Sequence, residues 1–168
     1  WFMPIIESAL GVEKAFEMGF SLLFITDHNS IANAAATVNA GKDFIDLRIY
    51  PGMEITTREE IHILSLFENM DDAGRTQNYI NNYLPDAYFE KEKQEQIIAN
   101  EYDEVEGYYE KSLFSAVDLD LDEIIELIHQ YNGIAVGAHI DRQSFSIVSQ
   151  LGFIPDKCRL DALEISPN

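Results

Sequence analysis

Apolar positions along the chain follow two different patterns. Apolar residues at helical spacing, or runs rich in alanine, predict helices over residues 8–18, 30–42 and 121–130. Short, nearly unbroken apolar runs predict strands over residues 21–26, 47–50, 61–67, 134–138 and 160–165. Strands that are apolar throughout are typical of parallel sheets covered on both faces. Because the helices and strands alternate, the pattern predicts an α/β fold with parallel strands.

Polar and glycine residues mark where several of these elements begin and end. Asp120 and Glu123 have the spacing of a capping box at the start of the 121–130 helix, and Asn132-Gly133 follows its end. Pro51-Gly52 follows the 47–50 strand, and we expect the strand to end there.

Residues 68–118 interrupt the alternation and are rich in aromatic and charged side chains. We expect a helix over residues 71–83 and a hairpin within residues 96–114 that turns near Glu106-Gly107. We therefore interpret residues 1–168 as a single domain in which residues 68–118 form an insertion or a lid.

The composition is that of a globular protein. The chain has 168 residues, 46% of them hydrophobic, which is enough for one core without disulfide bonds. Cys158 is the sole cysteine, which favours a reducing compartment. The sequence shows no signal-peptide pattern and no apolar run of membrane-spanning length. We expect a cytoplasmic protein without a membrane partner.

The charge balance is strongly acidic. The chain has thirty acidic and eleven basic residues, which gives a net charge of −19. A surface of this sign repels polyanions, so we expect no binding of duplex nucleic acid. A small phosphorylated substrate remains compatible with this charge, because bound divalent cations reverse the potential inside a pocket.

Four potential metal ligands stand beside the predicted strands. His28 and His139 follow the 21–26 and 134–138 strands, Glu54 follows the Pro-Gly turn, and His62 opens the 61–67 run. The carboxyl ends of parallel strands meet on one face, so these side chains are expected to share a site. Imidazoles with one carboxylate suit zinc, manganese or iron better than calcium or magnesium.

A structural role is the alternative at each of these positions. A histidine beside a strand is commonly a hydrogen-bonded structural residue, and a glutamate after a turn is commonly solvated. The occurrence of all four at strand ends in one short chain favours the metal site. His129 lies within the 121–130 helix, and we interpret it as a surface or helix-packing residue.

Four motifs occur in an order that resembles the polymerase and histidinol phosphatase (PHP) superfamily. They are ITDHNS at residues 25–30, PGMEITT at 51–57, EIHIL at 60–64 and GAHIDR at 137–142. Residues 151–155 and 160–165 are similar to a stand-alone bacterial branch of PHP phosphoesterases. The resemblance extends over residues 11–166 and implies a distorted (β/α)7 TIM-like barrel.

The resemblance also implies a function and a ligand set. PHP phosphoesterases hydrolyse phosphoesters with metal-activated water and hold up to three divalent ions. By position, Glu54 matches a ligand that bridges two metals, and His62 and His139 match ligands that complete one of those two sites. His28 matches a ligand of the third metal.

Two further residues match positions beside the metals. Asp27 matches a residue that orients a ligand, and Arg142 matches one that contacts the substrate phosphate. For Arg142 an ordinary surface salt bridge is the alternative.

The sequence departs from the family at two motifs. The family opens with His-x-His and closes with Asp-x-His, and neither occurs in these 168 residues. The predicted strands are also too few for a barrel, so we expect an incomplete one, as a fragment or a degenerate member. A non-catalytic PHP-like scaffold therefore stays open as an alternative function. A metal-dependent amidohydrolase ranks lower, because no lysine ends a predicted strand.

Overall fold

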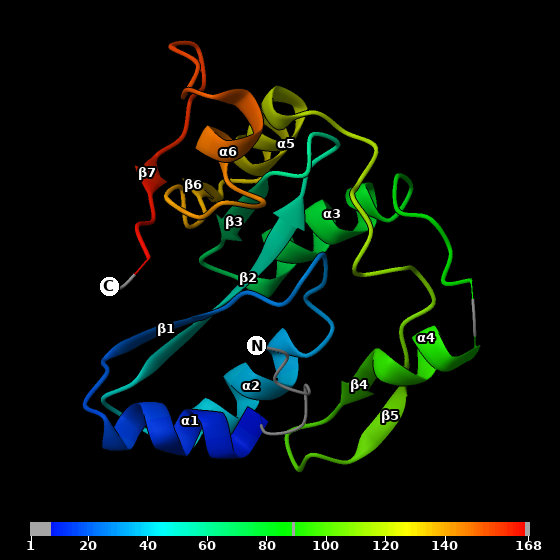
Figure 1. The fold of residues 1–168 in the computed structure, drawn as a ribbon. Helices are drawn as coiled ribbons and strands as arrows, with labels where there is room; N and C mark the ends of the chain where they lie inside the picture. Colours follow the sequence, from blue (N-terminus) through cyan, green and yellow to red (C-terminus); the bar gives the residue numbers. More distant parts are fainter. Residues whose placement is uncertain (1–7, 89, 167–168) are drawn as a thin grey trace.

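A computed structural model describes residues 8–88 and 90–166 (Figure 1). Its centre is a five-stranded sheet with the order β1-β2-β3-β6-β7. The strands are β1 (Leu22–Ile25), β2 (Arg48–Thr56), β3 (His62–Leu66), β6 (Ile134–Gly137) and β7 (Ala162–Leu163). The mixed α/β class predicted from the sequence is confirmed.

The prediction of parallel strands was wrong for β3. Strand β3 runs antiparallel to both β2 and β6, whereas β1 with β2 and β6 with β7 are parallel pairs. Residues 57–61 are all that connects β2 to β3, and a parallel connection needs a dozen or more residues. The sheet is open within the described ranges, with β1 and β7 at its edges, and does not close into a barrel there.

The described part of the chain contains six helices. They are α1 (Ser8–Glu17), α2 (Ala34–Ala40), α3 (Met70–Ile80), α4 (Glu90–Glu95), α5 (Leu121–Gln130) and α6 (Ile147–Leu151), with a 3-10 turn η1 (Gly41–Asp43) after α2. The predicted helices over 8–18, 71–83 and 121–130 are confirmed. The helix expected over 30–42 begins only at Ala34, because residues 26–33 form a loop. No helix in the described ranges is long and apolar enough to cross a membrane.

The main core lies between the central sheet and helices α3 and α5. Fully buried side chains of β2 and β3 pack with the apolar face of α5, and they include Met53, Ile55, Ile63, Ile124 and Ile128. The predicted capping box holds the first turn of α5: Asp120 accepts from the Glu123 amide, and the Glu123 side chain accepts from the Asp120 amide. Figure 1 shows α5 beside β6, and at the other end of the molecule α1 packs on α2, which packs on β2.

Strand β2 continues through Pro51-Gly52, so the prediction that these residues end it was wrong. Pro51 lies opposite Ile25 of β1, and its carbonyl oxygen accepts a hydrogen bond from the Phe67 amide at 3.0 Å. A Cβ atom at Gly52 would stand 2.6 Å from the Ser65 carbonyl oxygen, so the close strand spacing requires glycine. Glu54 therefore lies within a long strand rather than after a turn.

A second sheet is the antiparallel hairpin of β4 (Ile97–Ala99) and β5 (Val105–Tyr108). The predicted hairpin is confirmed, but its turn lies at residues 100–104 and not at Glu106-Gly107. The Asn100 Oδ1 atom accepts from the amides of Tyr102 and Glu104, each at 3.0 Å. This side chain thus stabilises the turn in a way typical of asparagine. The hairpin and α4 stand apart from the central sheet, at the lower right of Figure 1.

Candidate metal centre

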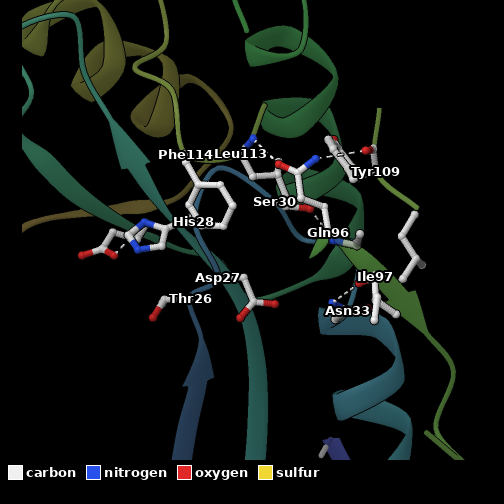
Figure 2. Close-up of a pocket in the computed structure, with 13 residues that line it drawn as sticks. Thr26, Asp27, His28, Ser30, Asn33, Gln96, Ile97, Tyr109, Leu113 and Phe114 are labelled. Carbon is white, nitrogen blue, oxygen red and sulfur yellow. Dashed lines mark hydrogen bonds and ion pairs between the residues drawn. The ribbon is translucent and has the colours of Figure 1, made fainter. Parts of the chain in front are cut away.

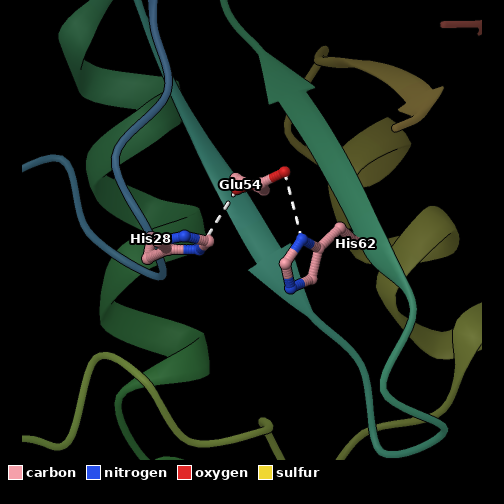
Figure 3. Close-up of side chains that lie close together, drawn as sticks. All are labelled: His28, Glu54 and His62. Carbon is pink, nitrogen blue, oxygen red and sulfur yellow. Dashed lines mark ion pairs between the residues drawn. The ribbon is translucent and has the colours of Figure 1, made fainter. Parts of the chain in front are cut away.

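The four predicted metal ligands come together from four strands of the central sheet. Glu54 lies on β2, His62 begins β3, His28 follows β1, and His139 follows β6. The strand order places β1, β2, β3 and β6 side by side, so the four side chains meet at one end of the sheet. Figure 3 shows His28 and His62 on either side of the Glu54 carboxylate.

The Glu54 carboxylate is the centre of this cluster. Its Oε2 atom is 3.1 Å from His28 Nδ1, and its Oε1 atom is 3.2 Å from His62 Nδ1 and 3.3 Å from His139 Nε2. His62 Nδ1 and His139 Nε2 are also 3.3 Å apart. One carboxylate oxygen thus faces one imidazole, and the other oxygen faces two.

Unusual backbone conformations surround the cluster. Asn29, His139 and Phe145 have positive φ angles of 48°, 30° and 56°. Asn29 follows His28, and the ring of Phe145 stacks on that of His62 with centroids 4.6 Å apart. The Phe145 carbonyl oxygen also accepts from the His62 amide at 2.9 Å. Such conformations cost about 1–3 kcal/mol each and concentrate at functional sites.

Asn29 fixes the loop that carries His28. Its buried side chain donates to the carbonyl oxygens of Leu113 and Ser115 at 2.9 and 3.0 Å. It also accepts from the Thr56 amide on β2 at 3.0 Å. Neither Asn29 nor Phe145 was predicted as a site residue from the sequence, since nothing in the local pattern distinguishes them from ordinary loop residues.

The electrostatics of the cluster favour the metal-binding forms of two side chains. Burial raises the pKa of Glu54, but a hydrogen bond from His62 and the charges of the three imidazoles outweigh burial and hold the pKa below its ordinary value. Burial lowers the pKa of His28 more than the Glu54 carboxylate raises it. At neutral pH the site therefore presents a carboxylate beside a neutral imidazole, and a metal needs both.

The donor atoms fit a divalent transition metal. Ligands at 2.0–2.1 Å around a tetrahedral ion stand about 3.3–3.4 Å from one another, close to the 3.1–3.3 Å found here. His28, Glu54 and His62 each offer a ligand atom within 4.8 Å of the others. His139 Nδ1 is buried without a hydrogen-bond partner among the described residues, which leaves Nε2 as its atom toward the cluster. The donor set has the nitrogen and oxygen composition that zinc, manganese and iron accept.

Asp27 and Arg142 are not part of this cluster. Asp27 lines a cavity beside it, and burial raises the pKa of the Asp27 carboxyl group. Arg142 lies in the exposed turn after His139, where its Nε atom donates to Ser166 Oγ at 3.3 Å. Their proposed roles stay predictions. His129 pairs instead with Asp161, with Nε2 and Oδ2 2.9 Å apart.

A cavity of about 200 Å³ adjoins His28 and Glu54 (Figure 2). Its walls come from the loop after β1 and from the 96–114 region, including Ile97, Ile98 and Phe114. The ring centroid of Phe114 is 6.4 Å from that of His28, so an apolar side chain stands next to the candidate metal ligands. The cavity therefore joins the sheet's polar cluster to a wall that contains both apolar and polar side chains.

Two polar side chains of this wall fix the hairpin in place. The Asn33 amide group donates to the Ile97 carbonyl at 3.1 Å and accepts from the Ala99 amide at 2.9 Å. Gln96 accepts from the Leu113 amide at 2.7 Å and donates to the Tyr109 and Lys111 carbonyls. Their hydrogen-bonding groups thus serve the fold of the wall.

Comparison with known proteins gives matches in structure but none in sequence. No protein-family model matches this chain, and no curated protein sequence matches it significantly. Similarity to solved structures at low identity establishes the fold and leaves the activity open.

Three solved structures share the fold. The lesion-specific Endonuclease Q of Pyrococcus furiosus aligns with a TM-score of 0.59 and 15% identity over 96% of this chain and 36% of its own. An Endonuclease Q complex with a 27-mer duplex substrate, which has an abasic lesion at the active site, aligns with a TM-score of 0.60 and 14% identity. This alignment covers 90% of this chain and 35% of the Endonuclease Q chain. A provisionally assigned metal-dependent phosphoesterase of Bifidobacterium adolescentis aligns with a TM-score of 0.55 and 17% identity. This alignment covers 94% of this chain and 71% of the phosphoesterase chain. The chain thus spans about a third of Endonuclease Q.

The complex with duplex DNA corrects one prediction from the sequence. We expected the net charge of −19 to exclude duplex nucleic acid as a partner. Endonuclease Q has a similar fold and holds a duplex at its active site, so this inference from total charge was wrong. Net charge describes the whole surface, whereas binding depends on the potential at the site. The similarity of the fold to a metal-dependent phosphoesterase and to Endonuclease Q agrees with the resemblance of the chain's motifs to the PHP superfamily.

Proposed function

We propose that this chain carries the metal centre of a metal-dependent phosphoesterase, with His28, Glu54, His62 and His139 as ligands of zinc, manganese or iron. The observation that carries the proposal is the convergence of three imidazoles on one carboxylate with donor separations of 3.1–3.3 Å. Hydrogen bonding within a purely structural cluster does not require three histidines around one acidic group. A shared cation gives all four a common partner.

The two oxygens of Glu54 support a bridging role for this residue. Oε2 faces His28, whereas Oε1 faces His62 and His139. A carboxylate that points each oxygen at a different imidazole set is suited to hold two cations at once. When bound, such cations act as Lewis acids toward phosphoryl oxygens and lower the pKa of bound water.

Two side chains outside the cluster complete the proposed site. Asp27 lies in the cavity beside His28, where its raised pKa suits a group that exchanges protons or orients a ligand. Arg142 follows His139 in an exposed turn, and its planar guanidinium is suited to bind a phosphate. Rotation of the Arg142 side chain away from Ser166 is part of this proposal.

We propose a phosphoester as the substrate class. A cavity of about 200 Å³ next to His28 supports a small phosphorylated compound such as a nucleotide or a phosphorylated metabolite. The likeness to Endonuclease Q supports a phosphodiester of nucleic acid. Both share the phosphoryl group on which the proposed metal centre acts. Residues 68–118, which include much of the cavity wall, are proposed as the part that selects among them.

The fold similarity also supports a larger architecture. We propose that the five-stranded sheet forms part of a PHP-type distorted (β/α)7 barrel and that residues 1–168 make up one PHP-like domain. TM-scores of 0.55–0.60 over at least 90% of the chain support this proposal.

Metal content and hydrolysis of an aryl phosphate test the proposal together. Purified protein is loaded with Mn²⁺ or Zn²⁺, its metal content is measured by elemental analysis, and release of phosphate is followed. We expect at least one metal per chain, and loss of both metal and turnover in His139→Ala. His129→Ala is the matched control, because His129 pairs with Asp161 and not with Glu54. Absence of bound metal in the unsubstituted protein would contradict the proposal.

A scaffold that binds metal without catalysis is the second candidate function. The absence of His-x-His and Asp-x-His from this sequence favours it. Stoichiometric metal without turnover of aryl phosphate, nucleotide or abasic-site duplex supports the scaffold. Turnover that is lost in His139→Ala supports the enzyme.

A further inference from the structure

We infer that Glu164 is a positioning residue that holds His139 in the metal centre. This inference rests on the proposed function, because it assigns a purpose to the orientation of a proposed metal ligand. Glu164 follows β7, a strand of only two residues at the edge of the central sheet. Its side chain is exposed, so packing against the core does not explain its position.

Three hydrogen bonds connect Glu164 to the segment around His139. The Glu164 amide donates to the Gly137 carbonyl at 2.8 Å, and the Ile140 amide donates to the Glu164 carbonyl at 2.9 Å. Between these two backbone bonds, the Glu164 carboxylate accepts from the His139 amide through Oε2 at 2.8 Å. The Glu164 backbone thus bonds to Gly137 and Ile140, and the Glu164 side chain bonds to His139, which lies between them in the sequence.

His139 requires such support because its backbone conformation is unfavourable. Its φ angle of 30° lies in the left-handed region, which residues other than glycine rarely adopt. The bond from its amide to a charged acceptor is of the stronger kind and offsets part of this strain. With a relaxed backbone, the direction of the Cα–Cβ bond changes and carries the imidazole away from Glu54.

The ring of His139 is held through one of its two nitrogens. Its Nε2 atom lies 3.3 Å from both Glu54 Oε1 and His62 Nδ1. A histidine that binds a metal usually donates its second ring nitrogen to a carboxylate or carbonyl, which fixes the ring. His139 Nδ1 is buried and has no such partner among the described residues. With Nδ1 unpaired, the backbone of His139 contributes to the orientation of the imidazole, and Glu164 provides the side-chain bond that the structure shows to the His139 amide.

Substitutions that keep or remove the acceptor separate positioning from simple stability. Glu164→Gln keeps an oxygen that accepts from the His139 amide, whereas Glu164→Ala removes it. We expect Glu164→Ala to weaken Co²⁺ and Zn²⁺ binding about 10-fold, as loss of a group that supports a ligand does. We expect Glu164→Gln to stay within roughly 3-fold of the unsubstituted protein. Glu126→Ala is the matched control, because Glu126 is an exposed glutamate paired only with Arg159 among the described residues.

The experiment measures Co²⁺ affinity and the visible absorption of bound Co²⁺, which reports the ligand set without catalysis. The same variants are made in a His139→Ala background, where the loss caused by Glu164→Ala is expected to disappear. Amide hydrogen exchange at residue 139 in the metal-free protein is expected to accelerate in Glu164→Ala and not in Glu164→Gln.

The possible outcomes distinguish the positioning role of Glu164 from the proposed function of the metal centre. Equal Co²⁺ affinity in Glu164→Ala and the unsubstituted protein overturns the positioning role and leaves the proposed function intact. An equal loss with and without His139 also overturns it, because the effect then does not pass through that residue. Failure of the unsubstituted protein to bind Co²⁺ overturns the proposed function and the positioning role together.

Discussion

The central sheet and residues 68–118 contribute to the candidate site in different ways. The sheet supplies all four members of the His–Glu cluster from the ends or the middle of β1, β2, β3 and β6. Residues 68–118 supply much of the cavity wall, including Ile97 and Phe114, but no member of that cluster. The candidate metal ligands and much of the cavity wall therefore come from different segments of the chain.

The two regions also differ in how their polar side chains are used. In the sheet, Glu54 and its histidines face one another across strands. In the 68–118 region, Gln96 and Asn100 bond to backbone groups of the same region. Asn29 connects the regions, because it bonds both to Thr56 and to Leu113. If the proposed function holds, we expect substitutions in the sheet to abolish metal binding and substitutions in the 68–118 region to alter the choice of substrate.

Removal of the shared carboxylate is expected to have the largest effect. Glu54→Ala leaves three imidazoles without the anion that all of them face, so we expect metal affinity to fall roughly 1,000-fold, or about 4 kcal/mol. Isothermal titration with Mn²⁺ or Zn²⁺ measures the change. Glu68→Ala, at an exposed position after β3, is the control. Unchanged affinity in Glu54→Ala would remove the sheet cluster as the metal site.

Glycine substitutions compare the packing of the two regions. Gly52 lies on β2, between β1 and β3, and Gly52→Ala places a Cβ atom 2.6 Å from the Ser65 carbonyl oxygen. A Cβ atom at Gly107, in contrast, has no atom within 4 Å. We expect Gly52→Ala to lower the free energy of unfolding by about 2–3 kcal/mol and Gly107→Ala to change it by less than about 0.5 kcal/mol. Urea unfolding followed by circular dichroism measures both. Similar losses would show that the strand spacing does not depend on Gly52.

Asn29→Ala is expected to separate the two regions. The variant loses bonds to Leu113, Ser115 and Thr56, and we expect a loss of about 2 kcal/mol in the free energy of unfolding. Amide hydrogen exchange should accelerate around residues 113–117 while the amides of β3 remain protected. Exchange that accelerates evenly across the sheet would argue against a local connection.

Phe114→Ala should affect substrate binding and leave metal binding unchanged. Phe114 lines the cavity beside His28, so its loss is expected to raise KM for an aryl phosphate about 5-fold, in line with about 1 kcal/mol of aromatic contact. Tyr102→Ala, in the exposed hairpin turn, is the control. A fall in metal affinity would mean that the two regions do not divide their roles as described.

The pH dependence of Asp27 is expected to give the smallest effect. Burial raises its folded-state pKa above the unfolded value, so stability is lost as pH rises from the unfolded pKa through the folded one. Asp27→Asn has no such loss, and we expect the metal-free variant to unfold at higher urea than the unsubstituted protein at pH 7. The difference should vanish as pH falls toward 4. A difference that is constant with pH would show that ionisation of Asp27 is not its cause.

Local signals in the sequence predicted much of the fold. Asp120 with Glu123 determined the start of α5, and apolar runs located β1, β3 and β6. The antiparallel direction of β3 was missed because an apolar run does not encode the direction of a strand, whereas the short 57–61 connection does. Pro51-Gly52 was misread because a tight approach of neighbouring strands requires glycine as much as a turn does.

The candidate site was predictable only in its ionisable members. His28, Glu54, His62 and His139 stand out by residue type beside predicted strands, and the structure brings them together. Asn29 and Glu164 act through hydrogen bonds to residues more than 20 positions away in the sequence, and no local sequence pattern predicts such bonds. Phe145 owes its place to a positive φ angle and a stacking contact, which are properties of the folded chain.

Crystals of this chain grown with Mn²⁺ test the central claim most directly, through anomalous scattering. We predict an anomalous peak within coordination distance of Glu54 and at least two of the three imidazoles of His28, His62 and His139. A protein that binds Mn²⁺ elsewhere, or leaves this cluster without a peak at saturating Mn²⁺, would contradict the account.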